Sequence, residues 1–421
     1  MSFSTDRPRT WQACIACGNE TVDLDPATRC RQCGGLLEVR HRAPEATREE
    51  LLQRFTERRG GPRGAGTTSG VWRFRELVMP SAELIVSHPE GNTPLLHRTA
   101  LDDYTGVPEL LLKHEGHNPT GSFKDRGMTV GVTQAVRIGA RAVACASTGN
   151  TAASLAAYAA QARIAALVLV PAGAVAPGKV AQAVAYGARV FAVRGDFDDA
   201  MRLVEESSAR LGVYLLNSVN PYRIEGQKTI IFELLQQLMW DPPAWIVVPA
   251  GNLGNLSAFG KALRELQTYG LIPRLPRLVG VQAAGAAPFA QGFADGFRTR
   301  HTVRADTVAS AIRIGNPASW DRAVQAIRDT DGLVLTATDE EILEAKAAVD
   351  RSGVGCEPAS AAAVAGVRQL ARAGRVAPGD RVVAVLTGHL LKDPGGPAGE
   401  PVTIEPTVSA LERAIEAAAR D

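Results

Sequence analysis

The chain has 421 residues, more than one ordinary domain needs, so two or three domains are expected. Its hydrophobic content of 45% is that of a globular protein, and its net charge of +2 gives no case for binding nucleic acid or a membrane. The first residues lack the apolar core of a signal peptide, and the longest apolar run, 164–176, is too short and too interrupted to span a membrane. We therefore expect a soluble, cytoplasmic protein.

Four of the six cysteines lie in one short segment, with the spacing Cys14-x2-Cys17-x12-Cys30-x2-Cys33. A glycine follows each pair and permits the tight turn that aims two thiolates at one ion. Two such turns predict a four-sulfur structural zinc site. Disulfides are the alternative, although nothing suggests export, and iron in the same ligand set stays open. With few aromatic residues and no basic cluster, this zinc ribbon is expected to cap an enzyme rather than to bind nucleic acid.

From residue 110 onward, short apolar runs rich in β-branched residues alternate with helical patterns. This alternation predicts an α/β protein with parallel sheets whose faces are covered by helices. The predicted strands are 110–114, 143–147, 166–170, 190–193, 213–217, 245–250, 278–282 and 382–386. The predicted helices are 128–138, 151–161, 179–186, 255–267 and 359–373.

We interpret this pattern as two open parallel-sheet lobes, with ligand chemistry at the carboxyl ends of their strands. The zinc ribbon is predicted to comprise residues 1–42. The large lobe is predicted to comprise residues 43–115 and 223–421, and the small lobe residues 116–222.

The segment Glu115-Gly-His-Asn-Pro-Thr-Gly-Ser-Phe-Lys-Asp-Arg-Gly127 joins a predicted strand to a predicted helix. It places Lys124 in the first helical turn, where the helix dipole disfavours a cation. A lowered pKa would make this amine neutral, which is the form that attacks a carbonyl cofactor. An ordinary surface lysine is the alternative.

Three other predicted strands end in polar loops. Ser147-Thr-Gly-Asn-Thr151 offers donors suited to a carboxylate or phenolate oxygen. Gly251-Asn-Leu-Gly-Asn255 allows backbone N–H groups to converge on a phosphate. Thr387 offers a neutral hydroxyl suited to an unprotonated pyridine nitrogen.

These motifs, with Glu90-Gly-Asn-Thr-Pro-Leu95, resemble those of the pyridoxal-phosphate enzymes of the tryptophan-synthase-β fold type, fold type II, and among them the threonine synthases. The resemblance covers the chain from about Gly91 to Pro394. A zinc ribbon ahead of the catalytic core is also familiar among the shorter threonine synthases. The resemblance implies two α/β lobes with the pyridoxal 5'-phosphate site between them.

By this resemblance, Lys124 forms the imine with the cofactor and later acts as general base. Asn150 would contact the cofactor's 3′-oxygen, and Thr387 would face its pyridine nitrogen. The residues that would hold the cofactor phosphate are Gly251, Asn252, Leu253, Gly254 and Asn255.

The segment Asn217-Ser-Val-Asn-Pro-Tyr-Arg223 resembles the one that grips the substrate phosphate in the family. Arg223 suits this role because a guanidinium pairs bidentately with phosphate. As an arginine that follows a turn, it is expected to be mobile. The resemblance assigns the substrate carboxylate and phosphate to Ser147, Thr148, Thr151, Asn217, Ser218 and Arg223.

The implied reaction converts O-phospho-L-homoserine and water to L-threonine and phosphate, in a homodimer. Serine/threonine dehydratases of the same fold are an alternative, but they usually have a glycine run where this chain has Asn252 and Asn255. A synthase for another phosphorylated amino acid, such as a cysteate synthase, shares more of the motifs. A zinc-ribbon binding protein with an inactive core is a third alternative, which the intact Lys124, Asn150 and Thr387 oppose.

Overall fold

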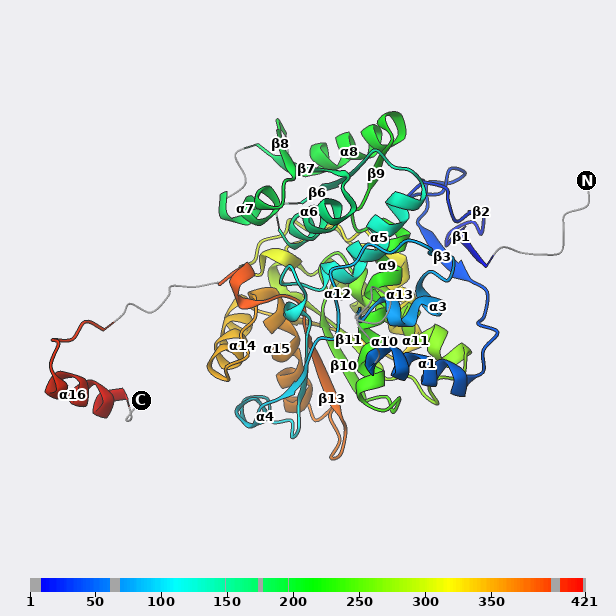
Figure 1. Ribbon diagram of the computed structural model, residues 1–421. Coiled ribbons are helices and arrows are strands. Elements are labelled where there is room, and N and C mark those ends of the chain that lie inside the picture. The colour runs from blue at the N-terminus through cyan, green and yellow to red at the C-terminus, as the bar shows by residue number, and fades with distance from the viewer. Residues whose placement is uncertain are drawn as a thin grey trace, which may run out of the picture.

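The computed structural model describes residues 9–60, 69–147, 149–172, 177–195, 197–394 and 402–418. Figure 1 shows a small sheet at the N-terminus beside two larger α/β lobes, one above the other. Within the described residues, no helix is long and apolar enough to cross a membrane.

The N-terminal sheet is antiparallel and has the order β2-β1-β3. Its strands are β1 (Thr10–Cys14), β2 (Glu20–Val22) and β3 (Leu37–His41). Helix α1 (Arg48–Gly60) follows and buries Leu51 and Phe55 in the core of the large lobe.

The large lobe contains a sheet of the order β12-β11-β10-β13-β5-β4, parallel except for the edge strand β4. Its central strands are apolar on both faces because helices cover both: Val247 faces the core formed with α15 (Pro358–Arg372), whereas Ile246 and Val248 face the core formed with α11 (Gly254–Thr268). The strands are β4 (Leu95–His97), β5 (Leu111–His114), β10 (Trp245–Pro249), β11 (Arg277–Ala283), β12 (Leu333–Ala337) and β13 (Val382–Leu386).

The small lobe contains a parallel sheet of the order β8-β7-β6-β9. Val143 and Cys145 face a core shared with α5 and α6, while Ala142, Ala144 and Ala146 face α8. The elements are α5 (Lys124–Arg137), β6 (Ala142–Ala146), α6 (Asn150–Ala162), β7 (Ala165–Pro171), α7 (Pro177–Ala185), β8 (Arg189–Val193), α8 (Phe197–Leu211) and β9 (Val213–Leu215).

The remaining helices connect or cover these sheets. The last of them, α16, lies apart from the body of the molecule (Figure 1). They are α3 (Arg75–Val78), α4 (Thr99–Thr105), α9 (Pro221–Gln227), α10 (Thr229–Gln237), α12 (Pro288–Ala294), α13 (Trp320–Asp329), α14 (Asp339–Arg351) and α16 (Val408–Ala418). The short 3-10 turns are η1 (Trp72–Phe74), η2 (Glu115–His117), η3 (Ala284–Ala286), η4 (Ser310–Ile312) and η5 (Leu390–Lys392).

The predicted fold class is confirmed, and each predicted strand and helix matches an observed element with ends shifted by at most four residues. Several observed elements were not predicted, among them β12 and α8. Strand β12 lies at the edge of its sheet and is only partly buried, so its short sequence Leu-Val-Leu-Thr-Ala lacks the continuous apolar run of a central strand.

Candidate active site

The turn before Lys124 is held against the end of β13. Phe123 N donates to the carbonyl of Thr387 at 3.0 Å, and His389 N donates to the carbonyl of Gly121 at 2.9 Å. Ser122 and Gly388 pair between these contacts as an antiparallel bridge. This pairing brings Lys124 and Thr387, far apart in sequence, to the same edge of the large sheet.

The Lys124 amine lies in a partly buried site, with Nζ 4.2 Å from the centre of the Phe123 ring. Burial, together with the nearby Arg223 cation, lowers the pKa of Lys124 to about 7, although Glu357 acts in the opposite direction. The lowered pKa that the sequence predicted is therefore found. At neutral pH a large share of this amine is uncharged and nucleophilic.

A buried charge network supports the helix that starts at Lys124. Arg126 pairs with Glu115 at 2.7 Å and with Glu233 at 2.9 Å. Glu233 also pairs with Lys113 at 2.6 Å and Arg73 at 2.9 Å. Because a partner meets each charge, this network fixes the first turn of α5.

Asp125 ties the loop before Lys124 to α6. Its carboxylate accepts from the Thr120 N–H at 2.7 Å and from the hydroxyls of Thr120 and Ser154, both at 2.6 Å. Burial raises the pKa of Asp125 to about 6. Asp125 is therefore a structural support rather than a base directed at the cleft.

Asn150 meets a carboxylate that sequence reasoning missed. Its Nδ2 lies 3.2 and 3.0 Å from the two oxygens of Glu357, the residue before α15. Burial raises the pKa of Glu357 above its usual range. A Cβ at Gly388 would lie 2.5 Å from the Glu357 carboxyl carbon, so the carboxylate can take this place only because residue 388 is glycine.

Thr387 also has an unpredicted partner. Its hydroxyl lies 2.9 Å from the hydroxyl of Ser360 on α15, and both residues are buried. Ser360 Oγ also accepts from the Gly388 N–H at 2.9 Å, which fixes its position. The Thr387 hydroxyl is therefore held by a neutral group.

The loop after β10 leads into the N-terminus of α11, as predicted. A Cβ at Gly251 would lie 2.8 Å from the Ile312 Cα, so the close approach of the two backbones requires glycine. Leu253 is left-handed (φ 63°), a strained conformation for a leucine that turns the chain into α11. The first N–H groups of the helix have no acceptor within it, which suits an anion. The buried Oδ1 of Asn255 has no partner.

Asn252 and Asn217 connect the loops around the cleft. Asn252 Nδ2 donates to Ser218 Oγ at 2.7 Å, so the predicted cofactor loop and the predicted substrate segment meet. The Asn217 amide pairs with the backbone N–H and C=O of Ala146 at 2.9 and 3.0 Å. Asn217 therefore holds the end of β6, where the next loop begins.

Arg223 is 2% exposed and lies on α9, so the expected mobile arginine is in fact fixed by its surroundings. Its Nη1 donates to the Leu216 carbonyl at 3.3 Å, and its Nε has no partner. No ion pair with a carboxylate is found for it among the described residues. Burial lowers its pKa to about 10. A buried cation in this state calls for an anionic ligand.

Two predicted substrate residues flank the start of α6. Ser147 Oγ accepts from the Gly149 N–H at 3.3 Å, and Thr151 lies in the first turn of the helix. Thr148 lies outside the described residues.

The missed residues share one weak signal in the sequence. Proline is favoured at the first position of a helix, so Pro358 indicates that a helix starts there. Glu357 is then the helix cap, and Ser360 lies in the first turn. No sequence pattern indicates that Asn150 and Thr387 are their partners.

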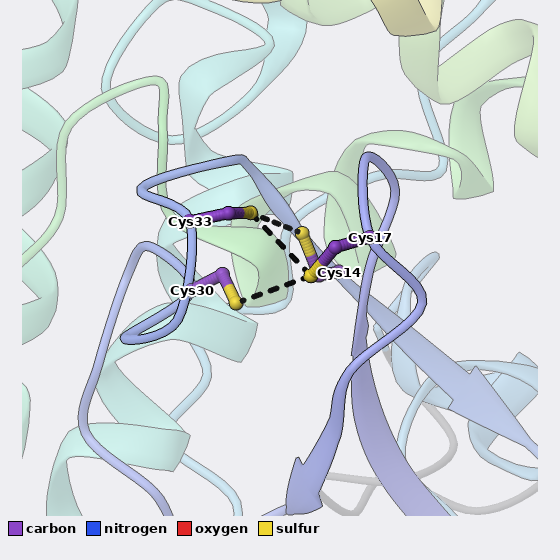
Figure 2. A group of neighbouring side chains, drawn as sticks. All are labelled: Cys14, Cys17, Cys30 and Cys33. Atoms are coloured by element: carbon purple, nitrogen blue, oxygen red, sulfur yellow. Dashed lines mark hydrogen bonds between the residues drawn. The ribbon is translucent and has the colours of Figure 1, made fainter.

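The four predicted cysteines converge, as Figure 2 shows. Their sulfur atoms lie within 4.8 Å of one another, with Cys14–Cys33, Cys17–Cys30 and Cys17–Cys33 separations of 3.5, 3.7 and 3.4 Å. A tetrahedral ion with sulfur bonds of about 2.3 Å requires separations of about 3.8 Å, whereas a disulfide requires about 2.05 Å. All four thiols are free, and their separations fit a metal site better than a disulfide.

The cleft residues fit pyridoxal phosphate. The fit rests on the Lys124 amine with its pKa of about 7, the free N–H groups at the start of α11, and the neutral hydroxyl of Thr387. These are the types of group that such a cofactor needs at its carbonyl, its phosphate and its ring nitrogen.

A family model described as "Pyridoxal-phosphate dependent enzyme" matches residues 86–388. Threonine synthase from Methanocaldococcus jannaschii is 44% identical over 96% of this chain and 99% of its own length. Threonine synthase from Mycobacterium leprae is 50% identical over 72% of this chain and 83% of its own length. The structure of threonine synthase from Escherichia coli matches with a TM-score of 0.67 and 19% identity, over 96% of this chain and 94% of that one, which supports the fold. The chain belongs to the pyridoxal-phosphate dependent enzymes and, within them, to the threonine synthase family.

Proposed function

We propose that this enzyme converts O-phospho-L-homoserine and water to L-threonine and phosphate. The observation that carries the proposal is Arg223, a buried arginine with an unpartnered Nε whose charge acts on the Lys124 amine. The phosphate of the cofactor already has its donors, which are the N–H groups at the start of α11. The additional cation is therefore explained by a second phosphate, the one carried by the substrate.

Pyridoxal phosphate would be held by Lys124 at its carbonyl, Asn150 at its 3′-oxygen, Thr387 at its ring nitrogen and the loop 251–255 at its phosphate. When bound, the cofactor supplies a carbonyl for the substrate amine and a sink for the negative charge that develops on carbon. Glu357 orients the Asn150 amide through hydrogen bonds of 3.0 and 3.2 Å. The Lys124 amine is the base that removes the proton from the substrate Cα, because its pKa of about 7 suits proton transfer at neutral pH.

Arg223 and Ser218 would bind the substrate phosphate, and Asn252 orients the Ser218 hydroxyl at 2.7 Å. A proton leaves Cβ, the Cγ–O bond breaks with its electron pair going to the departing phosphate, and a proton adds to Cγ to form the methyl group. One water then supplies the hydroxyl on Cβ and one proton, so overall one water is consumed for each phosphate released. A phosphate held by Arg223 is already neutralised in part when it leaves.

The substrate carboxylate would lie at the loop after β6. Ser147 and Thr151 flank the start of α6, whose N–H groups favour an anion, and we propose that Thr148 binds the carboxylate with them. Asn217 would act here through Ala146, since its amide pairs with that backbone at 2.9 and 3.0 Å.

The test is phosphate release by the Arg223→Ala variant, with cofactor occupancy measured on the same sample. Losing a charge-assisted contact costs about 1.5–3 kcal/mol, so kcat/KM for phosphohomoserine should fall at least about tenfold while the cofactor stays bound. Arg368→Ala, which loses a surface pair with Glu344, is the control. Assays with phosphoserine and threonine separate this activity from those of the related synthases and dehydratases. Loss of the cofactor in Arg223→Ala, or an unchanged kcat/KM, would overturn the role of Arg223.

We also propose that the four cysteines hold one structural zinc ion. Four protein sulfurs leave no open coordination position for a reacting water, and no further function is needed to explain their geometry. Metal analysis should find one zinc per chain, with neither iron nor a disulfide, and Cys30→Ser should reduce the zinc content. Zinc-free native protein would contradict this assignment.

We further propose that the enzyme is a cytoplasmic homodimer and that residues 116–222 form its small lobe. The strands of the four-stranded sheet lie between residues 142 and 215, which supports that boundary. Light scattering tests the dimer, and limited proteolysis tests the boundaries.

A further inference from the structure

The N-terminal ribbon contacts two helices that carry active-site residues. Strand β3 packs against α9, and the segment after β2 contacts both α5 and α9 (Figure 1). Helix α5 begins with Lys124, and α9 contains Arg223. The ribbon is thus connected to both cations of the cleft.

The first anchor is Asp23, which follows β2. Its backbone carbonyl accepts a hydrogen bond from Gln134 of α5 at 2.7 Å and another from the hydroxyl of Tyr222 on α9. Its carboxylate pairs with Arg137 of α5 at 2.9 Å. One ribbon residue therefore ties α5 to α9, next to Arg223.

The second anchor is His41, the last residue of β3. Its Nε2 lies 2.9 Å from the carboxylate of Glu225 on α9, and both side chains are almost fully buried. Glu225 also pairs with Lys261, which donates to the backbone carbonyl of Val39 in β3. The ribbon thus holds α9 through side chains on either side of Arg223 in the sequence.

Packing on the opposite side leaves α9 little freedom. A Cβ at Gly226 would lie 1.7 Å from the Arg126 carbonyl oxygen, so the backbones of α9 and α5 are in direct contact. Helix α9 cannot move closer to α5, and the contacts of Tyr222 and Glu225 with the ribbon limit how far it can move away. The position of the Arg223 guanidinium therefore depends on the ribbon.

The anchors of Lys124 are different. The turn before it pairs with residues 387–389, and Arg126 after it belongs to the buried charge network. Asp23 contacts α5 three turns further along, at Gln134 and Arg137. A disturbance of the ribbon should therefore reach Arg223 before it reaches the amine.

The ribbon has little apolar core of its own. Its buried apolar cluster consists of Cys14, Cys30 and Leu37, of which the two cysteines are proposed metal ligands. A unit this small can scarcely hold its shape without the metal. Loss of the metal would loosen Asp23 and His41, and with them both anchors of α9.

We infer that the metal-bound ribbon positions Arg223, so that occupancy of the four-cysteine site controls recognition of the substrate phosphate. The inference rests on the proposed role of Arg223 as the phosphate-binding residue. Tyr222 and His41 are positioning residues, which act on the substrate through α9. Their loss weakens binding and leaves the chemistry at Lys124 intact.

The experiment uses Tyr222→Phe and His41→Gln, each in the full-length, cofactor-loaded enzyme. Tyr104→Phe and His97→Gln make the same changes elsewhere: the Tyr104 hydroxyl accepts from Arg368 at 3.3 Å, and His97 pairs with Asp102 at 2.7 Å. Each ribbon variant should raise KM for phosphohomoserine about three- to tenfold, with kcat and cofactor absorbance within about twofold.

Hydrogen exchange provides a readout that does not depend on turnover. The backbone amides of residues 221–227 should exchange faster in both ribbon variants than in the wild type. They should also exchange faster in wild-type enzyme whose metal has been removed with a chelator, and their exchange rate should be unchanged in the two controls. The chelated enzyme should also show a raised KM and retain its cofactor.

Arg223→Lys, measured in parallel, separates the two proposals. If it raises KM while the ribbon variants and chelation change neither KM nor exchange, the inference is overturned and the role of Arg223 stands. If Arg223→Lys and the Arg223→Ala variant described above both leave KM unchanged, Arg223 does not bind the phosphate and both proposals fail. If chelation or either variant releases the cofactor, the ribbon supports the whole fold, and the inference is also overturned.

Discussion

Two neighbouring regions of this enzyme bury charge in opposite ways. Around Glu233, the buried cations Arg126, Lys113 and Arg73 each lie 2.6–2.9 Å from a carboxylate oxygen. At the proposed substrate site, Arg223 is buried, and no carboxylate pairs with it within the described part of the chain. The first arrangement stabilises the fold, and the second is complete only when a ligand supplies the missing charge.

Three of the five groups in the network have pKa values shifted towards the charged form. In the network, pairing lowers the pKa of Glu115 and Glu233 and raises that of Arg126. For Lys113 and Arg73 burial outweighs pairing, and their pKa values fall to about 8 and about 10.

In the cleft, every shift favours the neutral form. Burial lowers the pKa of Lys124 to about 7 and that of Arg223 to about 10, and it raises the pKa of Glu357. Lys124 can therefore exchange protons near neutral pH, whereas the cations of the network stay mostly charged there.

The largest expected effect is the loss of activity on substitution of Lys124. Lys124→Ala should reduce kcat by at least about a thousandfold, because it removes both the cofactor's covalent partner and the proposed base. The absorbance band of the bound cofactor should disappear as well. Lys392→Ala, which changes another lysine with a lowered pKa near Glu357, should retain that band. An unchanged spectrum in Lys124→Ala would refute the assignment.

A substitution in the buried charge network around Glu233 should lower the stability of the fold. Glu233→Gln leaves Arg126, Lys113 and Arg73 without their shared carboxylate and should lower the free energy of unfolding by about 3–5 kcal/mol. Urea titration measures this change. Glu344→Gln, which breaks an exposed pair with Arg368, should cost less than about 1 kcal/mol. Equal losses in the two variants would contradict the distinction between scaffold and cleft.

Arg223 differs from the cations of the network, because its removal should impair substrate binding without a comparable loss of stability. Arg223→Met preserves most of the apolar stem and removes a buried cation that has no carboxylate partner. We expect the free energy of unfolding to change by less than about 1 kcal/mol in phosphate-free buffer. Added inorganic phosphate should stabilise the wild type and not the variant in thermal melts. A large loss of stability would place Arg223 in the scaffold.

The smallest effect is a pH dependence in wild-type enzyme. Since the pKa of Lys124 is about 7, its amine is protonated below pH 7 and neutral above it. The rate at which cofactor-free enzyme captures pyridoxal phosphate should therefore rise about tenfold per pH unit below pH 7 and level off above it. Stopped-flow absorbance measures this rate. A rate that continues to rise towards pH 10 would indicate an ordinary lysine.

Much of this architecture could be read from local sequence. Apolar runs that alternate with helical periods predicted two parallel sheets, since strands buried on both faces are apolar throughout. The paired cysteines and their glycines predicted the ribbon because metal ligation requires a fixed spacing and a tight turn. Lys124 and the loop 251–255 were predicted because both lie at strand-to-helix junctions, where glycine and helix N-termini have specific roles.

Tertiary structure decided what lies between these segments. The contact of Glu357 with Asn150 and that of Ser360 with Thr387 join residues from distant helices and strands, and polar contacts of this kind have no periodicity that a sequence would display. The burial of Arg223 was equally hidden. A local pattern predicts a turn followed by a helix, but only the packing of α9 between α5 and the ribbon removes this arginine from water and so determines its need for an anion.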